Sequence, residues 1–403
     1  MSQEPSPPDT TNGDAADAAE PASTAPAADA ARAAEFRPEA DFRLIPLQQL
    51  AEMEAPERAF LTVYLSSPDA FDSMKGRIEE VRGVLAGVPE ELEHFERSLE
   101  LVRGWLEENP PADAGAVVFA CWALDFVRGF PLAVAPRDRL WLGSSPFIKP
   151  LAELQDEYET FAVVAADNRA TRVFLVSSAM VAGEERVRGD VKNRVKKGGW
   201  SQKRYARRRE NELHHYAVEV AEVLGKLADE ASFDRIVLLG QKEAMEEIRD
   251  ALPQRLGDLL LEPRRAALDA GAEDLMTAAF EAFAEGERED ERQLWERIRE
   301  ESVGHGLAAL GATQVLKAAL VGRVEEMAVL RDADLDGTRC RDCENVVHGT
   351  PKTCQVCGSA SVFRVDLVDE LTRQVTLHGG RVDFTDPLPG LAEAGGVAAL
   401  LRY

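Results

Sequence analysis

Three closely spaced apolar runs in the middle of the chain are the strongest constraint on its fold. TFAVVAADN (160–168) and TRVFLVSS (171–178) are separated by a short turn, and the more polar MVAGEERVRGD (180–190) follows them. Runs of this length with a few residues between them are typical of neighbouring antiparallel strands. The sequence therefore predicts a hairpin meander over these three runs.

A helix, a strand and a second helix are predicted after the meander. Apolar residues recur at steps of three and four from Leu213 to Leu227, which places them on one face of a long helix. RIVLLG (235–240) predicts a short buried strand, and KEAMEEIRDAL (242–252) predicts a helix behind it. Strands that are followed by helix, strand and helix indicate an α/β domain, which we expect over residues 156–275.

Two further α/β units are expected on either side of this domain. A length of 403 residues favours two or three domains over one. Residues 41–155 contain strand-like runs around a helical stretch, and they predict an N-terminal α/β domain built on a mixed sheet. Residues 276–403 begin with a charged helix around Glu285–Glu301 and continue as helices alternating with short apolar strands. The predicted fold class is therefore α/β multidomain.

Residues 1–40 differ in composition from the rest of the chain. They are rich in Ala, Pro, Ser and Asp and contain almost no large apolar side chains, so they cannot bury enough surface to offset their ordering entropy. We expect a disordered acidic tail there. The chain has no apolar run long enough to cross a bilayer, no secretory signal and few cysteines, which predicts a cytoplasmic protein without a membrane partner.

Four of the five cysteines form two CxxC pairs, Cys340 with Cys343 and Cys354 with Cys357, with ten residues between the pairs. Two such pairs supply the four thiolates of a tetrahedral zinc site. A redox pair and free thiols are the alternatives, but the spacing favours structural zinc in a ribbon over residues 337–362. Because protein ligands would fill all four positions, we do not expect this metal to be catalytic.

A basic segment contrasts with the acidic chain around it. The net charge is −25, yet the segment from Arg186 to Arg209 contains eleven Lys and Arg and one acid, so it sums to about +10 and the remainder to about −35. Cations at this density neutralise phosphates, which predicts salt-sensitive binding to nucleic acid. The adjacent Gly198 and Gly199 permit a close approach of the backbone to a ligand.

The basic segment also contains two aromatic residues. Trp200 and Tyr205 could stack on bases or pack against the start of their own helix, and the sequence leaves both open. The chain has no GxxxxGK[ST] loop and no strand-linked GxGxxG, so a nucleotide cofactor has no support. No set of Ser, His and Asp indicates a hydrolase triad.

The segment GGWSQKRYARRRENELHHYAVEVAE resembles the GGQ region of the class 1 peptide chain release factors of eukaryotes and archaea. In that family two glycines and a glutamine lead into an SxxRFxRxR pattern and a long helix. The matching positions here are Ser201, Arg204, Tyr205, Arg207 and Arg209. With RIVLLGQKEAMEEI, LVDELTRQVTLHGGRVDF and GGVAALLRY, the resemblance covers roughly residues 160–403. It is strongest to the bacterial and archaeal release-factor-like branch, whose relatives include Pelota and the ankyrin-repeat zinc-finger peptidyl-tRNA hydrolase.

This resemblance implies an RNase H-like middle domain and a kink-turn-binding-protein-like C-terminal domain with a small zinc-binding insertion. It implies the ribosome, ribosomal RNA and peptidyl-tRNA as partners, and it leaves open a translational GTPase. It also implies that the ester of peptidyl-tRNA is hydrolysed at a tip formed by Gly198, Gly199 and Gln202. The residues expected to contact RNA are Lys196, Lys197, Trp200, Lys203, Arg204, Tyr205, Arg207, Arg208 and Arg209.

The sequence departs from the family in two places. Trp200 stands where the family has glutamine, and the nearest glutamine, Gln202, comes two positions later. The NIKS pattern, with which the family reads stop codons, is absent. The family's second stop-codon pattern is Tyr-x-Cys-x-x-x-Phe, and Phe119-Ala-Cys121 with Phe126 is one residue out of register with it, so we expect these residues to be strand core. Both departures favour ribosome rescue over termination. A non-catalytic, Pelota-like factor that binds the ribosome or tRNA is the alternative, and a scaffold whose basic loop meets an acidic protein is a third hypothesis.

Overall fold

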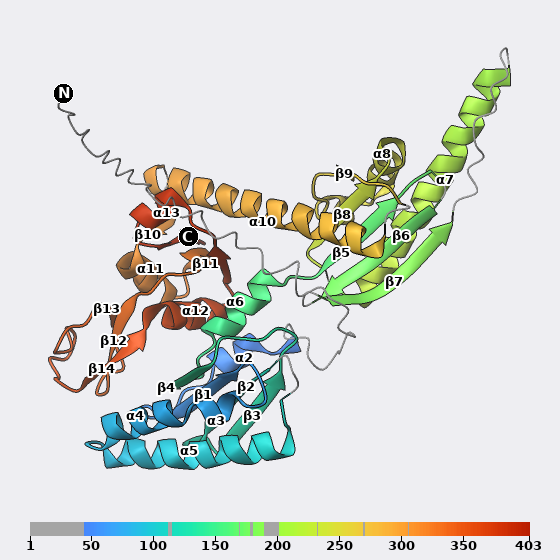
Figure 1. Cartoon of the computed structure of the whole chain (residues 1–403). Helices are drawn as coiled ribbons and strands as arrows, with labels where there is room; N and C mark the ends of the chain where they lie inside the picture. The colour runs from blue at the N-terminus through green and yellow to red at the C-terminus, as the bar shows by residue number, and fades with distance from the viewer. Residues whose placement is uncertain are drawn as a thin grey trace, which may run out of the picture.

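The computed structural model describes residues 44–111, 115–168, 170–177, 180–188, 201–231, 233–268, 271–304 and 306–403, with the backbone alone described for 180–188, 201–210 and Glu230. These residues form a mixed α/β multidomain fold with four sheets, which we name the N-terminal, middle, C-terminal and small sheets (Figure 1). The predicted acidic tail lies outside the described residues. Among the helices that are described, none is both long and apolar enough to span a membrane.

The N-terminal sheet has the strand order β3-β2-β1-β4, and every pair in it is antiparallel. The expectation of a mixed sheet is therefore wrong. The physical reason is the connection after β1, since helices α3, α4 and α5 return the chain to the end where β1 stops and Leu65 pairs with Ala116. The strands are β1 (Phe60–Leu65), β2 (Ala116–Cys121), β3 (Phe126–Pro131) and β4 (Arg139–Gly143). The helices are α2 (Leu47–Ala51), α3 (Ala70–Ser73), α4 (Lys75–Leu85) and α5 (Pro89–Glu108), with a 3₁₀ turn at Trp122–Leu124.

Helix α5 covers one face of the N-terminal sheet. Pro89 lies in its first turn together with two acidic residues, an arrangement that favours a helix start. Its apolar stripe includes Phe95, Leu99 and Val102, which are fully buried against β1 and β2. Cys121 is fully buried at the end of β2, as expected of a core residue.

The middle sheet has the order β7-β6-β5-β8-β9. Strands β5, β6 and β7 are antiparallel, which confirms the predicted meander, and β8 is parallel to β5. Helices α7 and α8 pack on one face and α10 on the other, so β5 is buried on both faces and its sequence is continuously apolar. The strands are β5 (Phe161–Ala166), β6 (Ala170–Ser177), β7 (Met180–Arg188), β8 (Arg235–Gly240) and β9 (Arg264–Arg265). The helices are α7 (Ser201–Glu230), α8 (Lys242–Ala251) and α9 (Gln254–Gly257).

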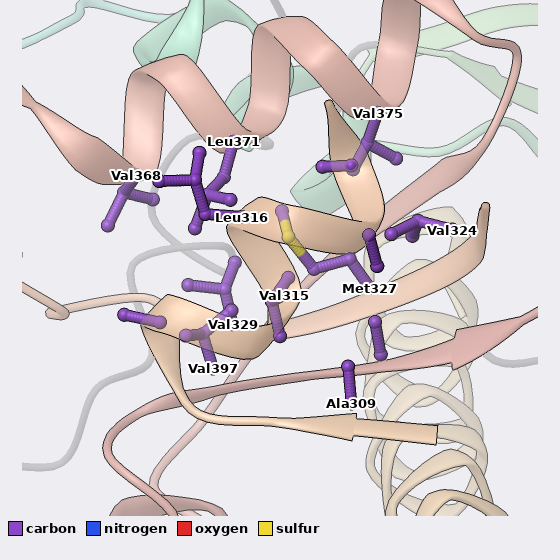
Figure 2. Packing of buried hydrophobic residues seen from close by; sticks show 14 of the residues in the cluster. Ala309, Val315, Leu316, Val324, Met327, Val329, Val368, Leu371, Val375 and Val397 are labelled. Atoms are coloured by element: carbon purple, nitrogen blue, oxygen red, sulfur yellow. The ribbon is translucent and has the colours of Figure 1, made fainter. Parts of the chain in front are cut away.

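The C-terminal sheet has the order β10-β16-β11-β15, with β15 parallel and β16 antiparallel to β11. Helices α11 and α12 cover one face, and their apolar side chains meet those of the strands in the core shown in Figure 2. The strands are β10 (Ala308–Leu310), β11 (Val324–Leu330), β15 (Arg381–Thr385) and β16 (Val397–Leu401). The helices are α11 (Ala312–Ala319), α12 (Leu367–Leu377) and α13 (Pro389–Glu393).

The small sheet lies between β11 and α12 in the sequence and carries the two CxxC pairs. Its strands are all antiparallel, in the order β13-β12-β14. They are β12 (Asp336–Cys340), β13 (Val346–His348) and β14 (Val362–Asp366).

One helix, α10 (Ala272–Val303), is shared by two cores. Leu275 and Phe283 in its first half pack on the middle sheet, whereas Leu294 and Ile298 in its second half pack on the C-terminal sheet. The charged helix expected around residues 285–301 therefore begins 13 residues earlier, and the boundary expected at residue 275 falls inside it. Figure 1 shows this helix running from one α/β unit to the other.

The N-terminal sheet is joined to the C-terminal one through α12 and α6 (Lys149–Glu157). The Asp369 carboxylate on α12 accepts hydrogen bonds from the backbone N–H groups of Ile148 and Lys149, each at 2.9 Å, at the start of α6. Arg373, also on α12, donates to the carbonyl of Ala51 at 3.0 Å. These bonds satisfy backbone groups at two helix ends with side chains from another part of the chain.

Candidate metal centre and basic helix

The four paired cysteines come together at one end of the small sheet. Cys340 ends β12, and the ligand sulfurs of Cys340, Cys343, Cys354 and Cys357 all lie within 4.8 Å of one another. The Sγ atoms of Cys340 and Cys357 are 3.6 Å apart, and those of Cys343 and Cys354 are 3.5 Å apart. Zinc–sulfur bonds of about 2.3 Å in a tetrahedron separate neighbouring sulfurs by about 3.8 Å. The sulfur positions are thus compatible with one zinc ion.

The backbone of both CxxC turns supports the same geometry. In the first turn the N–H of Glu344 donates to the carbonyl of Cys340 at 3.0 Å, and in the second the N–H of Gly358 donates to the carbonyl of Cys354 at 3.0 Å. Glu344 and Gly358 hold equivalent places, with φ of 58° and 76°. The two turns are therefore repeats of one conformation, which requires a left-handed residue after the second cysteine.

One thiol is prepared electrostatically to bind a metal. Hydrogen bonds from the backbone N–H groups of Cys357 and Val356 lower the pKa of the Cys354 thiol to about 6. A thiolate is the form that coordinates zinc. The donor set of four sulfurs fits a closed structural site, which leaves no ligand position for a substrate.

The predicted catalytic tip is not described by the structure. Gly198, Gly199 and Trp200, with Lys196 and Lys197, lie outside the described residues. The other residues of the predicted site lie in the first three turns of α7, where the structure describes the backbone but not the side chains. They are Gln202, Lys203, Arg204, Tyr205, Arg207, Arg208 and Arg209.

The second half of α7 fixes the direction of this helix. Leu213, Ala217, Val220 and Leu224 are buried against β5, β6, β8 and α8, as the helical stripe predicts. Tyr216 on the same stripe bonds through its hydroxyl to the hydroxyl of Thr171 in β6, and both residues are buried. At 1.5 Å per residue, Ser201 lies about 18 Å along the axis from the first of these anchors. Figure 1 shows the helix extending past the sheet.

A charged cleft was not predicted from the sequence. It has a volume of about 1910 Å³ and lies beside α10, between residues of the middle and C-terminal sheets. Burial, with neighbouring carboxylates, raises the pKa of Glu159 to about 7, of Glu287 to about 8 and of Glu291 to about 7. Arg235 from β8 is one of several arginines that line the cleft, and it pairs with Asp290 at 2.7 Å. Its charged residues come from segments far apart in the sequence, so no local pattern could have identified the cleft.

Comparison with known proteins finds relatives of this chain, and a family model matches its middle part. The family described as bacterial archaeo-eukaryotic release factor family 10 matches residues 146–284, which include the middle sheet and α7. Peptide chain release factor subunit 1 of Methanopyrus kandleri is 29% identical over 214 residues, 50% of this chain and 51% of that protein. Residues 146–284 are thus similar to a release-factor-like family. Its match to the Methanopyrus release factor spans only about half of that protein's length.

Other release-factor relatives align over more of the chain. The same subunit of Thermococcus kodakarensis is 23% identical over 366 residues, 82% of this chain and 85% of that protein. A Mycobacterium tuberculosis protein described as uncharacterized is 25% identical over 378 residues, 88% of this chain and 96% of its own length. Among solved structures, Saccharomyces cerevisiae Dom34, a translation termination-like factor, aligns over 69% of this chain and 74% of that one, with 14% identity and a TM-score of 0.40.

Proposed function

We propose that this release-factor-like protein associates with the ribosome in the cytoplasm and hydrolyses the ester of peptidyl-tRNA, in ribosome rescue rather than in stop-codon termination. Gly198, Gly199 and Gln202 form the catalytic tip in this proposal. The observation that carries it is the position of the GGWSQ segment, which leads into the first turn of a 30-residue helix whose first turns are basic and whose far half is anchored in the sheet core. The family match over residues 146–284 includes this segment.

The length of α7 supports a role in reaching into a narrow RNA site. Thirty residues extend about 45 Å, and the cations lie in the turns that precede the buried stripe. RNA phosphate attracts this basic end and repels the remainder of the chain, which carries about −35. The charge distribution therefore favours an approach with the helix end leading.

The chemistry assigned to the tip is the addition of water to an ester. The water oxygen bonds to the carbonyl carbon, the bond from that carbon to the 3′ oxygen of the tRNA breaks, and a proton from the water ends on that oxygen. The neutral amide of Gln202 can hold the water through hydrogen bonds without losing a proton, and positioning of this kind lowers the barrier. Trp200 offers only one N–H donor and no acceptor.

The test is peptide release from ribosomes loaded with peptidyl-tRNA. We expect Gln202→Ala to slow release about 100-fold, the size of effect seen when one positioned polar group is removed from an active site. Gln254→Ala is the matched control, because Gln254 is an exposed glutamine on α9, and it should release at the wild-type rate. Release by Gln202→Ala as fast as the wild type would show that the catalytic assignment is wrong.

The alternative is a non-catalytic, Pelota-like factor that binds the ribosome or tRNA, and Trp200 at the family's glutamine position favours it. Under this alternative the wild type releases no peptide, yet it co-sediments with ribosomes. Arg204→Glu with Arg207→Glu should abolish co-sedimentation under either function. The control is Arg249→Glu, an exposed arginine on α8, which should co-sediment normally.

Further assignments belong to the same proposal. The middle sheet, with three antiparallel strands followed by two parallel ones, is RNase H-like, and the C-terminal sheet is kink-turn-binding-protein-like. The partners are ribosomal RNA and peptidyl-tRNA, with a translational GTPase as a candidate. The four cysteines hold one structural zinc ion, and metal analysis of the purified protein should find about one per chain.

A further inference from the structure

Arg341 links the cysteine site to the N-terminal sheet. It lies between Cys340 and Cys343, inside the first CxxC turn, and its guanidinium pairs with the Glu91 carboxylate in the first turn of α5. These two residues are 250 positions apart in the sequence. A residue of the metal-binding turn is therefore also a contact between two parts of the fold.

The partner of Arg341 is a buried charge. The Glu91 side chain is 0% exposed, and its second oxygen accepts a hydrogen bond from Arg58 Nε at 2.8 Å. The Phe363 ring of β14 lies against both guanidiniums, 4.9 Å from that of Arg341 and 5.8 Å from that of Arg58. A carboxylate at this depth is stable only while its cations stay in place, because an unpaired buried charge is costly.

The cysteine turn is what keeps Arg341 in place. The backbone N–H of Arg341 donates to the carbonyl of Ser361 at 2.9 Å, and the preceding residue, Cys340, is one of the four metal-binding cysteines. Cys340, Val346 and Cys354 are the buried apolar residues among those described at 336–366, so the small sheet has almost no hydrophobic core of its own. Small metal-binding units of this kind depend on the metal for their fold.

We propose that metal binding at the four cysteines and docking of α5 are coupled through the Arg341–Glu91 pair. With the metal bound, the turn holds Arg341 against Glu91 and the start of α5 is fixed to the small sheet. Without it, Arg341 leaves, Glu91 retains Arg58 alone, and the first turns of α5 open to solvent. The coupling is reciprocal, so the docked α5 also strengthens metal binding.

The contacts of α12 with α6 and α2 do not depend on the cysteine turns, so the opening is limited to the start of α5. Asp369 on α12 still caps α6, and Arg373 still binds the carbonyl of Ala51. Neither contact involves a residue of the cysteine turns. The response to metal loss is therefore expected at α5 and absent at the contact between α12 and α6.

The test is backbone hydrogen exchange on the full chain, before and after zinc is removed with a chelator and the loss is verified by metal analysis. In the wild type, removal should speed exchange in the first turns of α5 about tenfold and leave α6 and β16 unchanged. Arg341→Ala should show the fast exchange even with zinc bound, and its zinc affinity should fall about tenfold. Arg341→Lys, which keeps the charge and loses the forked geometry, should lie between the two.

The matched control is Arg364→Ala. Arg364 belongs to the same small sheet, pairs with Asp336 and is 72% exposed, so its variant should behave as the wild type does. Unchanged exchange of α5 after zinc loss would overturn the proposal, and so would a zinc-dependent change that persists in Arg341→Ala. Fast exchange throughout β16 in the chelated wild type would also overturn it, because the metal would then stabilise the whole C-terminal core. Should Arg341→Ala fail to fold, the Arg341→Lys variant and the chelated wild type decide the question.

Discussion

The hydroxyl pair between Thr171 and Tyr216 adds a polar contact to the apolar packing of α7 on the middle sheet. Both side chains are buried, so each hydroxyl depends on the other for its hydrogen bond. Burial is the main reason that the pKa of Tyr216 is raised above its ordinary value of 10.0. The bond joins the buried stripe of α7 to strand β6, and it therefore helps to set the direction of the helix.

We predict that Tyr216→Phe lowers the free energy of unfolding of the middle sheet by about 1–3 kcal/mol, because it leaves the Thr171 hydroxyl buried without a partner. Thr171→Val in the Tyr216→Phe background should recover most of that loss, since both polar groups are then gone. The measurement is hydrogen exchange of β5 and β8 in the two single variants and the double variant. Additive losses in the double variant would contradict the prediction.

Single residues differ in how far the sequence could predict them. The cysteine site follows from spacing alone, because two CxxC turns need no information from the rest of the chain. Gly358 is recognisable as a turn residue, whereas Glu344 holds the equivalent left-handed place without any signal in its side chain. The sequence identifies Glu91 as an acidic residue in the first turn of a helix. Its second role, the ion pair with Arg341, depends on a residue 250 positions away. No local pattern encodes a contact of that range.

The carboxyls on α10 make the stability of this helix sensitive to pH. Glu287 is half-buried and faces Glu159, Arg235, Asp290 and Glu291. Burial is the main reason that its pKa rises from the ordinary 4.5 to about 8. The folded state then binds more protons than the unfolded state between these values, so stability falls as the pH rises through this window.

We predict that Glu287→Gln removes part of this pH dependence. At pH 8.5 the variant should melt about 2–4 °C above the wild type, and at about pH 3.5 the two should melt together, because the wild-type carboxyl is then protonated in both the folded and the unfolded state. Glu289→Gln is the control, since Glu289 is exposed on the same helix and bonds to Gln293 and Arg292, which lower its pKa. A thermal melt at each pH is the measurement, and equal pH profiles for Glu287→Gln and wild type would refute it.

Elements were predicted best where a run of apolar residues defines them. Strands β5 and β8 are continuous apolar runs that the sequence identifies directly. Helix α12 lies among the alternating helices and strands expected after residue 276, but the sequence does not indicate that its polar residues Asp369, Glu370 and Arg373 are buried at the junction with α2 and α6. The first half of α10 was missed because AEDLMTAAFEAF packs on a sheet that precedes it in the sequence, which periodicity alone cannot show.

At the scale of the whole molecule, the cores of the middle and C-terminal sheets share one helix, α10. We predict that Leu275→Ala and Leu294→Ala, two changes on α10, destabilise different sheets. Each removes a buried side chain and should cost about 3 kcal/mol. Hydrogen exchange should quicken in β5 and β8 for Leu275→Ala, and in β11 and β16 for Leu294→Ala.

Val303→Ala is the control for both changes, because Val303 lies on the same helix and is 87% exposed. It should alter neither sheet. Equal acceleration of both sheets by either leucine variant would mean that the two cores unfold as one unit, which the separate clusters on α10 argue against.

The α/β multidomain class could be predicted from chain length and from the order of strands and helices, whereas a helix shared between two cores could not. A boundary at residue 275 assumes that no helix is shared between two cores, and the sequence of α10 contains no proline that would mark a helix end there. The proposed catalytic tip remains a prediction from the sequence, because its side chains lie outside the described residues.

The continuity of α10 has a mechanical consequence. A helix of 32 residues is about 48 Å long, so a rotation of about 5° about its C-terminal end displaces its N-terminal end by about 4 Å. Because that end is embedded in the middle sheet, the sheet and α7 must move with it. A small change of tilt against the C-terminal sheet would thereby be amplified into a larger displacement of α7, with α10 as a lever arm.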